Sequence, residues 1–381
     1  MVTVEKLTDA IEKLPLVDHH VHGALAGAVD RATFEVMITE SSVPAPAGTT
    51  HFDSQVGFSI RRWCAPLLDL APHCSPEEYL ARRDELGNDE VNRRLLAATG
   101  VDRYLIETGY QGDATLGLQQ MATAGRRPVH EVVRLEAVAE EVARSGADAA
   151  GFAATVRERL ADSATTAVGF KSIVAYRHGF DVDPSRPADV EVARAADRWL
   201  REVGTTGTAR VADPVLLRFL LWQAVDLGRP LQLHVGYGDA DLDLHRSNPL
   251  LLTEWLRQVQ GRLDVLLLHC YPFHREAGYL AQVFPHVYFD VGLALNYVGA
   301  RSTAVVAESL ELAPFAKQLY SSDAWGPAEL HYLGALNWRR AMTRILGQWV
   351  DDGEWSLDDA VRVATMIGST NARRVYGLPE S

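Results

Sequence analysis

Strand-like apolar runs alternate with helix-like stretches along most of the chain, and this alternation restricts the fold more than any other feature. The runs expected as strands are 16–23, 103–108, 132–138, 167–175, 231–236, 264–270, 287–293 and 318–322. The stretches expected as helices are 3–14, 139–145, 149–162, 188–204, 214–226, 249–260, 277–284, 302–313 and 328–347. Strands that alternate with helices form a parallel sheet, and eight of them favour closure into a ring. The predicted fold is therefore α/β, a (β/α)8 TIM barrel.

Two stretches fall outside the alternation. Residues 24–100 lack strand character but contain helix-like stretches at 57–70 and 75–99, the second with a capped Ser-Pro-Glu-Glu start. This is too long for a bare connection, so we expect a helical insertion after the first strand. Residues 357–376 resemble two short helices broken at Gly368, expected to pack outside the barrel. Without a repeat or linker, the 381 residues are predicted to form one domain, 1–381.

Charge and cysteine usage restrict the function classes. The formal net charge of −13 disfavours general binding to nucleic acid or to anionic membranes. The N-terminal residues lack the pattern of a signal peptide, and no apolar run has the length of a membrane span. Cys64, Cys74 and Cys270 have neither zinc-knuckle spacing nor the density of a disulfide scaffold. We therefore expect a cytoplasmic protein in a reducing compartment.

The first run ends in a cluster of polar residues. Residues 16–23 read Leu-Val-Asp-His-His-Val-His-Gly, as expected for a buried strand that stops at a site. Because side chains alternate along a strand, His20 and His22 point to the same face. Two imidazoles on one face can bind a metal, although an isolated His-x-His is more often a pair of ordinary histidines.

Further candidate ligands lie where other runs end: Lys171 in the fourth, His234 in the fifth, His269 in the sixth and Asp323 after the eighth. In a barrel these ends meet at one mouth. Each alone has an ordinary reading, as a core histidine, a solvated lysine or a helix-capping aspartate. Together they would be costly to bury unless a cation held them. Nitrogen and carboxylate donors without a thiolate suit Zn²⁺, with Mn²⁺, Fe²⁺ or Co²⁺ as alternatives.

This ordered set resembles the amidohydrolase superfamily of metal-dependent barrels. The family pattern is His-x-His on strand one, lysine on strand four, histidines on strands five and six and aspartate on strand eight. The motifs at 169–172 (Gly-Phe-Lys-Ser), 269–272 (His-Cys-Tyr-Pro) and 371–377 (Asn-Ala-Arg-Arg-Val-Tyr-Gly) resemble its second group. Within it, the chain is most similar to amidohydrolase domains fused to, or encoded beside, glutamine-synthetase-like proteins.

The resemblance implies catalysis by metal-activated water. A bound dication lowers the pKa of its water to about 7, and Asp323 is the candidate general base. Lys171 either carries a carbamate that bridges two ions or points at an anionic substrate, so one or two ions are expected. With a single ion, His269 is free to act as a second acid or base.

Candidate substrate residues are less specific. Arg61, Arg62, Arg177 and Arg246 have the fork that suits a carboxylate, although each could be a surface arginine in a salt bridge. The aromatic residues Tyr271 and Trp325 follow ligand positions, so they are candidate pocket walls or simple packing.

The predicted function is hydrolysis of an amide C–N bond in a small, carboxylate-bearing substrate. A γ-glutamyl amide is suggested only by analogy with the synthetase association. One alternative is a single-metal, non-oxidative decarboxylase, which lacks a bridging lysine, so Lys171 favours hydrolysis. Another is a non-catalytic barrel that partners a synthetase. Family resemblance also suggests a homodimer.

Overall fold

A parallel sheet forms the centre of the molecule, in a computed structural model that describes residues 2–110 and 112–379. The assigned strands are β1 Leu16–Val21, β2 Val101–Glu107, β3 Val129–Arg134, β4 Gly169–Ser172, β5 Leu231–His234, β6 Val265–Leu268 and β7 Val287–Phe289. They hydrogen-bond in chain order, and every pairing is parallel. The predicted parallel α/β architecture is confirmed.

The eighth run does not form the regular strand that we expected. Its backbone bonds to both edges of the sheet: Leu319 N donates to Phe289 O of β7 at 3.0 Å, and His19 N of β1 donates to Tyr320 O at 3.3 Å. Beyond that point the Asp18 carboxylate replaces a backbone partner, since it accepts from Ser322 N at 2.9 Å and from Ser322 Oγ at 2.6 Å. Segment 318–326 therefore joins β7 to β1 as irregular chain.

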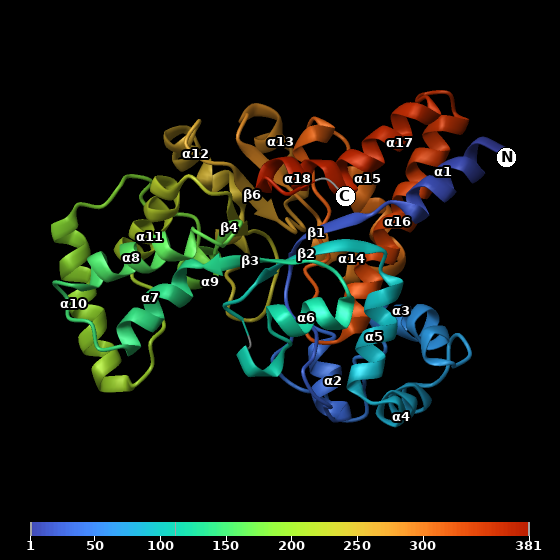
Figure 1. The fold of residues 1–381 in the computed structure, drawn as a ribbon, viewed down its shortest axis with the longest axis horizontal. Coiled ribbons are helices and arrows are strands. Elements are labelled where there is room, and N and C mark those ends of the chain that lie inside the picture. The colour runs from blue at the N-terminus through green and yellow to red at the C-terminus, as the bar shows by residue number, and fades with distance from the viewer. Residues whose placement is uncertain (1, 111, 380–381) are drawn as a thin grey trace.

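Helices cover the outside of the sheet on two sides. Before β3 lie α1 Val2–Lys13, α2 Arg31–Met37, α3 Gln55–Ser59, α4 Pro76–Leu86, α5 Asn88–Ala98 and α6 Leu118–Gly125. Between β3 and β6 lie α7 Leu135–Arg144, α8 Phe152–Ser163, α9 Val174–Arg177, α10 Asp189–Thr206, α11 Pro214–Leu227 and α12 Thr253–Val259. After β6 lie α13 His274–Val283, α14 Gly292–Tyr297, α15 Ser302–Ser309, α16 Ala328–Asp351, α17 Leu357–Thr365 and α18 Asn371–Tyr376. Figure 1 shows α7, α8 and α10 on the left of the sheet, and α3, α5 and α16 on the right.

Shorter helical segments complete the chain. These are π-helical Ile60–Cys64 and Met366–Thr370, and 3-10 segments Ala65–Leu68, Gly112–Ala114, Leu244–Ser247, Pro249–Leu252, Gly299–Arg301 and Phe315–Lys317. None of the described helices combines the length and apolar character that a bilayer crossing requires.

The connection between β1 and β2 carries helices α2 to α5 and isolated bridges at Ala24 and Leu25, and its helix boundaries differ from those that we expected. The expected helix over 75–99 is two helices, because Gly87 has a left-handed φ of 77° between α4 and α5. The stretch at 57–70 is a succession of α3, a π segment and a 3-10 segment. The third strand also ends earlier than expected, at Arg134, and α7 begins at the next residue, Leu135.

The C-terminal helix corrects another expectation. We predicted that residues 357–376 pack outside the barrel, and α17 does pack on the outer helices α1 and α16. In α18, by contrast, Ala372 and Tyr376 share a buried cluster with Val17, Leu105 and Leu266 of the strands. The break at Gly368 is a π-helical segment rather than a loop. Because a Cβ at Gly368 would approach Leu14 and Leu16 within 2.9 Å, only glycine lets this segment pack so closely.

Candidate metal centre

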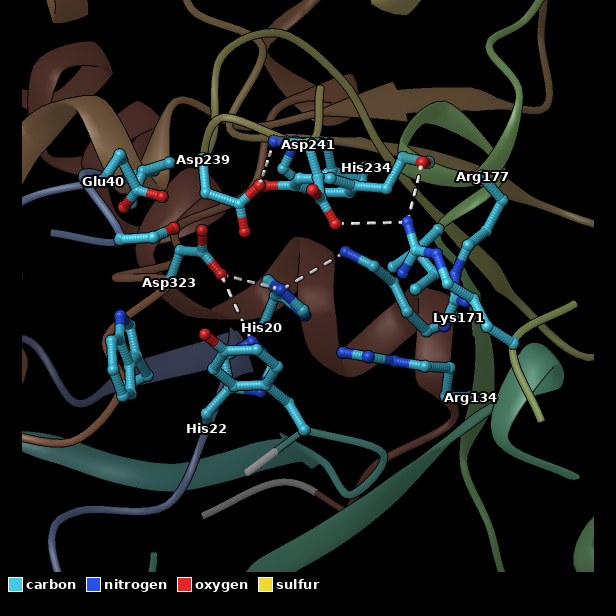
Figure 2. A pocket seen from close by; sticks show the side chains of 17 residues that line it. His20, His22, Glu40, Arg134, Lys171, Arg177, His234, Asp239, Asp241 and Asp323 are labelled. Carbon is cyan, nitrogen blue, oxygen red and sulfur yellow. Dashed lines mark hydrogen bonds and ion pairs between the residues drawn. The ribbon is translucent and has the colours of Figure 1, made fainter. Parts of the chain in front are cut away.

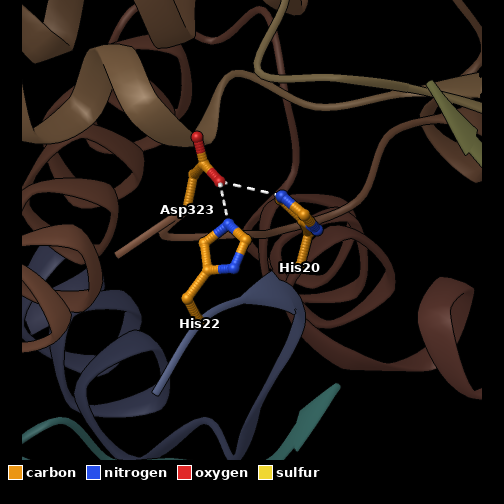
Figure 3. A group of neighbouring side chains, drawn as sticks. All are labelled: His20, His22 and Asp323. Atoms are coloured by element: carbon orange, nitrogen blue, oxygen red, sulfur yellow. Dashed lines mark ion pairs between the residues drawn. The ribbon is translucent and has the colours of Figure 1, made fainter. Parts of the chain in front are cut away.

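Two histidines at the end of β1 face the carboxylate of Asp323 (Figure 3). His20 Nε2 lies 2.8 Å from Asp323 Oδ1, and His22 Nε2 lies 3.8 Å from the same oxygen. The ligand atoms of these three residues are all within 4.8 Å of one another. The side chains of His20, His22 and Asp323 are 1%, 11% and 10% exposed, so they form a compact, poorly solvated donor set.

The other predicted ligands lie around this group. His269 Nε2 is 3.6 Å from the second oxygen of Asp323, and the rings of His269 and His234 are 4.2 Å apart. Lys171 Nζ approaches His20 Nε2 at 3.5 Å (Figure 2). The structure thus brings His20, His22, Lys171, His234, His269 and Asp323 to one end of the sheet.

Hydrogen bonds fix how two of the imidazoles are protonated. The amide of Gln232 donates through Nε2 to His19 O at 2.7 Å, so its Oε1 must accept from His20 Nδ1 at 2.9 Å. Likewise, Val235 O accepts from His269 Nδ1 at 2.8 Å. A neutral imidazole with its proton on Nδ1 has a lone pair on Nε2. His20 and His269 therefore direct lone pairs towards Asp323.

Lys171 brings one positive charge to His20 Nε2, but among the described residues the other donor atoms of this arrangement lack a cation between them. A lone pair on His20 Nε2 faces a carboxylate oxygen at 2.8 Å, which is repulsive unless a proton or cation lies between them. In addition, Nε2 of His234 and Nε2 of His269 are buried with no hydrogen-bond partner among the described residues. Imidazole nitrogens plus one carboxylate are donors that Zn²⁺ and related dications bind. The residues present therefore fit a divalent metal.

The pKa shifts describe a cluster that favours neutral bases beside one anion. Burial and the nearby Lys171 lower the pKa of His20 to about 3. Burial also lowers the pKa of Lys171 to about 8, against the opposing pull of Asp323. Burial opposes ionisation of Asp323, but His269 and His20 outweigh it and hold the pKa of this carboxyl below its usual value. Asp323 is therefore a carboxylate at neutral pH.

Asp290, just after β7, holds the backbone of the site. Its Oδ1 accepts from His269 N and Gly292 N at 2.8 Å each and from Ser321 Oγ at 2.7 Å. His269 has a left-handed φ of 49°, as does Asp323 at 48°. Non-glycine residues rarely adopt this conformation without support. The Asp290 bonds supply that support for His269.

A cavity of about 430 Å³ opens above the donor set (Figure 2). Of the predicted substrate residues, Arg177 and Trp325 line it. Side chains that the sequence analysis missed also line it: Glu40, Ser42, Tyr110, Arg134, Tyr176, Arg210, Asp239 and Asp241. Arg134 pairs in register with Lys171 at the end of β3. A correct third-strand boundary would have identified it.

The remaining predicted substrate residues lie elsewhere. Arg61 donates to the backbone of Cys74 at 2.6 Å, and Arg62 lines a separate pocket. Arg246 pairs with Asp181 at 2.8 Å. Tyr271 stacks on His274 with ring centroids 5.9 Å apart and is not among the side chains that line the metal cavity.

Histidines and a carboxylate at the end of a parallel sheet, beside a cavity, define the class of metal-dependent α/β enzymes. Comparison with known proteins places the chain within that class. The model of the amidohydrolase family matches residues 70–378, and the chain belongs to this family.

Two relatives extend over the whole chain. A crystal structure from Lactobacillus casei, assigned as a metal-dependent hydrolase, has 30% identity and a TM-score of 0.86, and 97% of each chain is covered. Protein fluG of Emericella nidulans is 29% identical over 420 residues, covering all of this chain but 48% of fluG. The chain thus spans about half the length of that relative. A uronate isomerase from Bacillus halodurans shares the fold alone, with 14% identity, a TM-score of 0.68 and coverage of 100% of this chain and 97% of the isomerase.

Proposed function

We propose that the chain hydrolyses the amide C–N bond of a small, carboxylate-bearing substrate, with a γ-glutamyl amide as the specific candidate. The observation that carries the proposal is Asp323, flanked by the unprotonated Nε2 atoms of His20 and His269 at the base of the cavity. We further propose that segment 318–326 takes the place of the eighth strand of a barrel, because its backbone forms hydrogen bonds with both β7 and β1.

The residues proposed to hold the metal, with Zn²⁺ as the specific candidate, are His20, His22, Lys171, His234, His269 and Asp323. A dication bound there would polarise a carbonyl oxygen and lower the pKa of water. Lys171 bears on the number of ions. An ammonium 3.5 Å from a ligand nitrogen would repel a dication, which supports the carbamate form of Lys171 as a further ligand.

Asp323 is the proposed proton carrier. Its carboxylate is ionised and reaches the cavity, so it can accept a proton from the attacking water. The same oxygen can then return that proton to the leaving amine. His269 is held by Val235 O with its Nε2 beside Asp323, so it is the proposed further metal ligand and, with a single ion, the proposed second acid or base.

The cavity walls carry opposite charges, which supports a zwitterionic substrate. Arg134 and Arg177 lie on the Lys171 side, and Glu40 and Asp239 lie on the Asp323 side (Figure 2). The side chain of Arg177 is 8% exposed and pairs through Nη2 with Glu140 at 3.0 Å, while its Nε and Nη1 have no hydrogen-bond partner among the described residues. These donors suit a substrate carboxylate, and the acidic side suits an ammonium. A γ-glutamyl amide carries both groups beside a scissile amide.

The decarboxylase alternative gains no support from the cavity. Lys171 reaches the donor set, as a bridging ligand of a hydrolase would. The scaffold alternative does not explain why buried donors converge on one cavity.

A direct test combines metal analysis with product detection. The purified chain should contain at least one transition metal per chain, and should release amine or ammonia from γ-glutamyl amides without release of CO₂. Asp323→Asn should abolish turnover. The matched control is Asp352→Asn at the exposed C-terminal end of α16, which should retain full activity. Full activity after chelation, or in Asp323→Asn, would refute the proposal.

A further inference from the structure

A second pocket, of about 410 Å³, lies on the side of the molecule formed by α3, α15 and α16. We call it the arginine pocket. Its lining includes Arg62, Trp63, Thr303, Arg340 and Arg344, and it shares no lining residue with the metal cavity. It is therefore a site distinct from the one described above.

Three arginines of this pocket have no acidic partner. Within residues 2–110 and 112–379, Arg62, Arg340 and Arg344 form no ion pair and donate no side-chain hydrogen bond. Acidic residues outnumber Lys and Arg in the chain, 50 to 37, so these arginines lack partners despite an excess of acidic groups. The guanidinium carbons of Arg62 and Arg340 each lie 4.1 Å from the ring centroid of Trp63. The two guanidinium carbons are therefore separated by at most twice 4.1 Å.

Such crowding of like charges is unfavourable; the Trp63 ring offsets part of the cost, and a bound anion would offset more of it. The pKa of Arg340 is lowered by burial, and then by Arg344 and Arg62. Ser302 and Thr303, the first residues of α15, also line the pocket, and the preceding residue provides no side-chain cap. The N–H of Ser302 already donates to Gly299 O, so the positive field of the pocket comes from its arginines.

We propose that the arginine pocket binds a small phosphate-bearing anion with at least two negative charges. A hollow of this volume suits a small molecule rather than a protein surface. Guanidinium groups match the oxygens of phosphate bidentately, and three of them can neutralise a diphosphate. Phe58 on the same lining is 53% exposed, which gives an organic group attached to the phosphate an apolar surface.

Calorimetric titration of the full chain tests the proposal with two probes, inorganic pyrophosphate and ATP. Saturable binding of at least one is expected, and binding only of ATP would identify a nucleotide as the source of the phosphate. Arg340→Gln and Arg344→Gln should each weaken binding tenfold or more and leave amide hydrolysis unchanged. Arg340→Lys retains the charge without the fork and should bind with intermediate affinity.

The control is Arg194→Gln, which makes the same charge change on the exposed face of α10, on the opposite side of the molecule (Figure 1). It should bind as the unmodified chain does. Because these probes also chelate metals, each titration is repeated with Asp323→Asn, where binding should persist. Binding that is lost in Asp323→Asn but retained in Arg340→Gln would overturn the proposal. So would binding of an acidic peptide in the absence of binding of either probe. The inference is independent of the proposed amide hydrolysis.

Discussion

Replacement of Gln232 by leucine should weaken metal binding although Gln232 is not itself a proposed ligand. Gln232 is fully buried in β5, and its amide bonds to three groups: His20 Nδ1, His19 O and Tyr376 Oη. Without the Oε1 acceptor, the proton of His20 can move to Nε2, which is the proposed ligand atom. The metal would then have to displace that proton.

The size of the effect follows from these contacts. Removal of a hydrogen-bond partner from a ligating histidine costs 10- to 100-fold in metal affinity, or about 1.4 to 2.8 kcal/mol. In addition, His20 Nδ1 and His19 O each lose the Gln232 amide as their hydrogen-bond partner. This loss costs about 1–3 kcal/mol for each buried group. The metal-free Gln232→Leu chain should therefore lose at least about 2 kcal/mol of unfolding free energy.

Competition with a chelator of known affinity measures the metal term, and denaturant unfolding of the metal-free chain measures the stability term. Gln232→Glu separates the two, because a carboxylate still accepts from His20 Nδ1 but cannot donate to His19 O. It should keep its metal affinity and lose stability. As a matched control, Gln318→Leu removes another buried glutamine, which bonds to Ser309 Oγ at 2.6 Å. It should lose stability alone. Unchanged metal affinity in Gln232→Leu would refute the assignment of His20 as an oriented ligand.

Two further predictions concern the cavity. If Lys171 carries a carbamate, native mass spectrometry at neutral pH should show a mass increase of one CO₂ on the chain. The increase should be absent from Lys171→Arg and should be lost on acidification. Its absence from the active, metal-loaded chain would refute the carbamate. Burial raises the pKa of Glu40 from 4.5 to about 7, so Glu40 becomes anionic only as the pH rises through about 7. The KM of an ammonium-bearing substrate should therefore fall over that range, and Glu40→Gln, but not Glu158→Gln on exposed α8, should remove this dependence; a KM that falls equally in Glu40→Gln would contradict it.

The parallel α/β fold was predictable from the alternation of strand-like and helix-like stretches. The same parallel arrangement explains why the predicted donors lie together in the structure. In a parallel sheet every strand ends on the same side, so a polar residue that ends an apolar run is placed by the topology alone. His234 and Lys171 could be identified in this way because each lies within the last two residues of a short, fully buried strand. This rule needs only the ends of the strands.

Where a strand boundary was misjudged, the same rule failed. The run 132–138 was interpreted as one strand, which placed Arg134 in its interior. In the structure, Leu135 opens α7, whose buried residues Leu135, Ala139 and Val142 follow a helical spacing. Strand and helix are fused there without a glycine, a proline or a capping side chain, so the sequence carries no local signal for the boundary.

The orientation of the ligands could not be predicted because it depends on contacts between distant residues. His19 bonds to Tyr376 Oη at 3.1 Å across 357 positions, and the same hydroxyl accepts from Gln232 at 2.8 Å. Local periodicity records which face a side chain occupies, but not which distant group it meets there. The Gln232 amide thus links Tyr376 of α18 to the imidazole of His20. Proton placement at the metal centre is therefore a property of the whole fold rather than of the His-x-His motif alone.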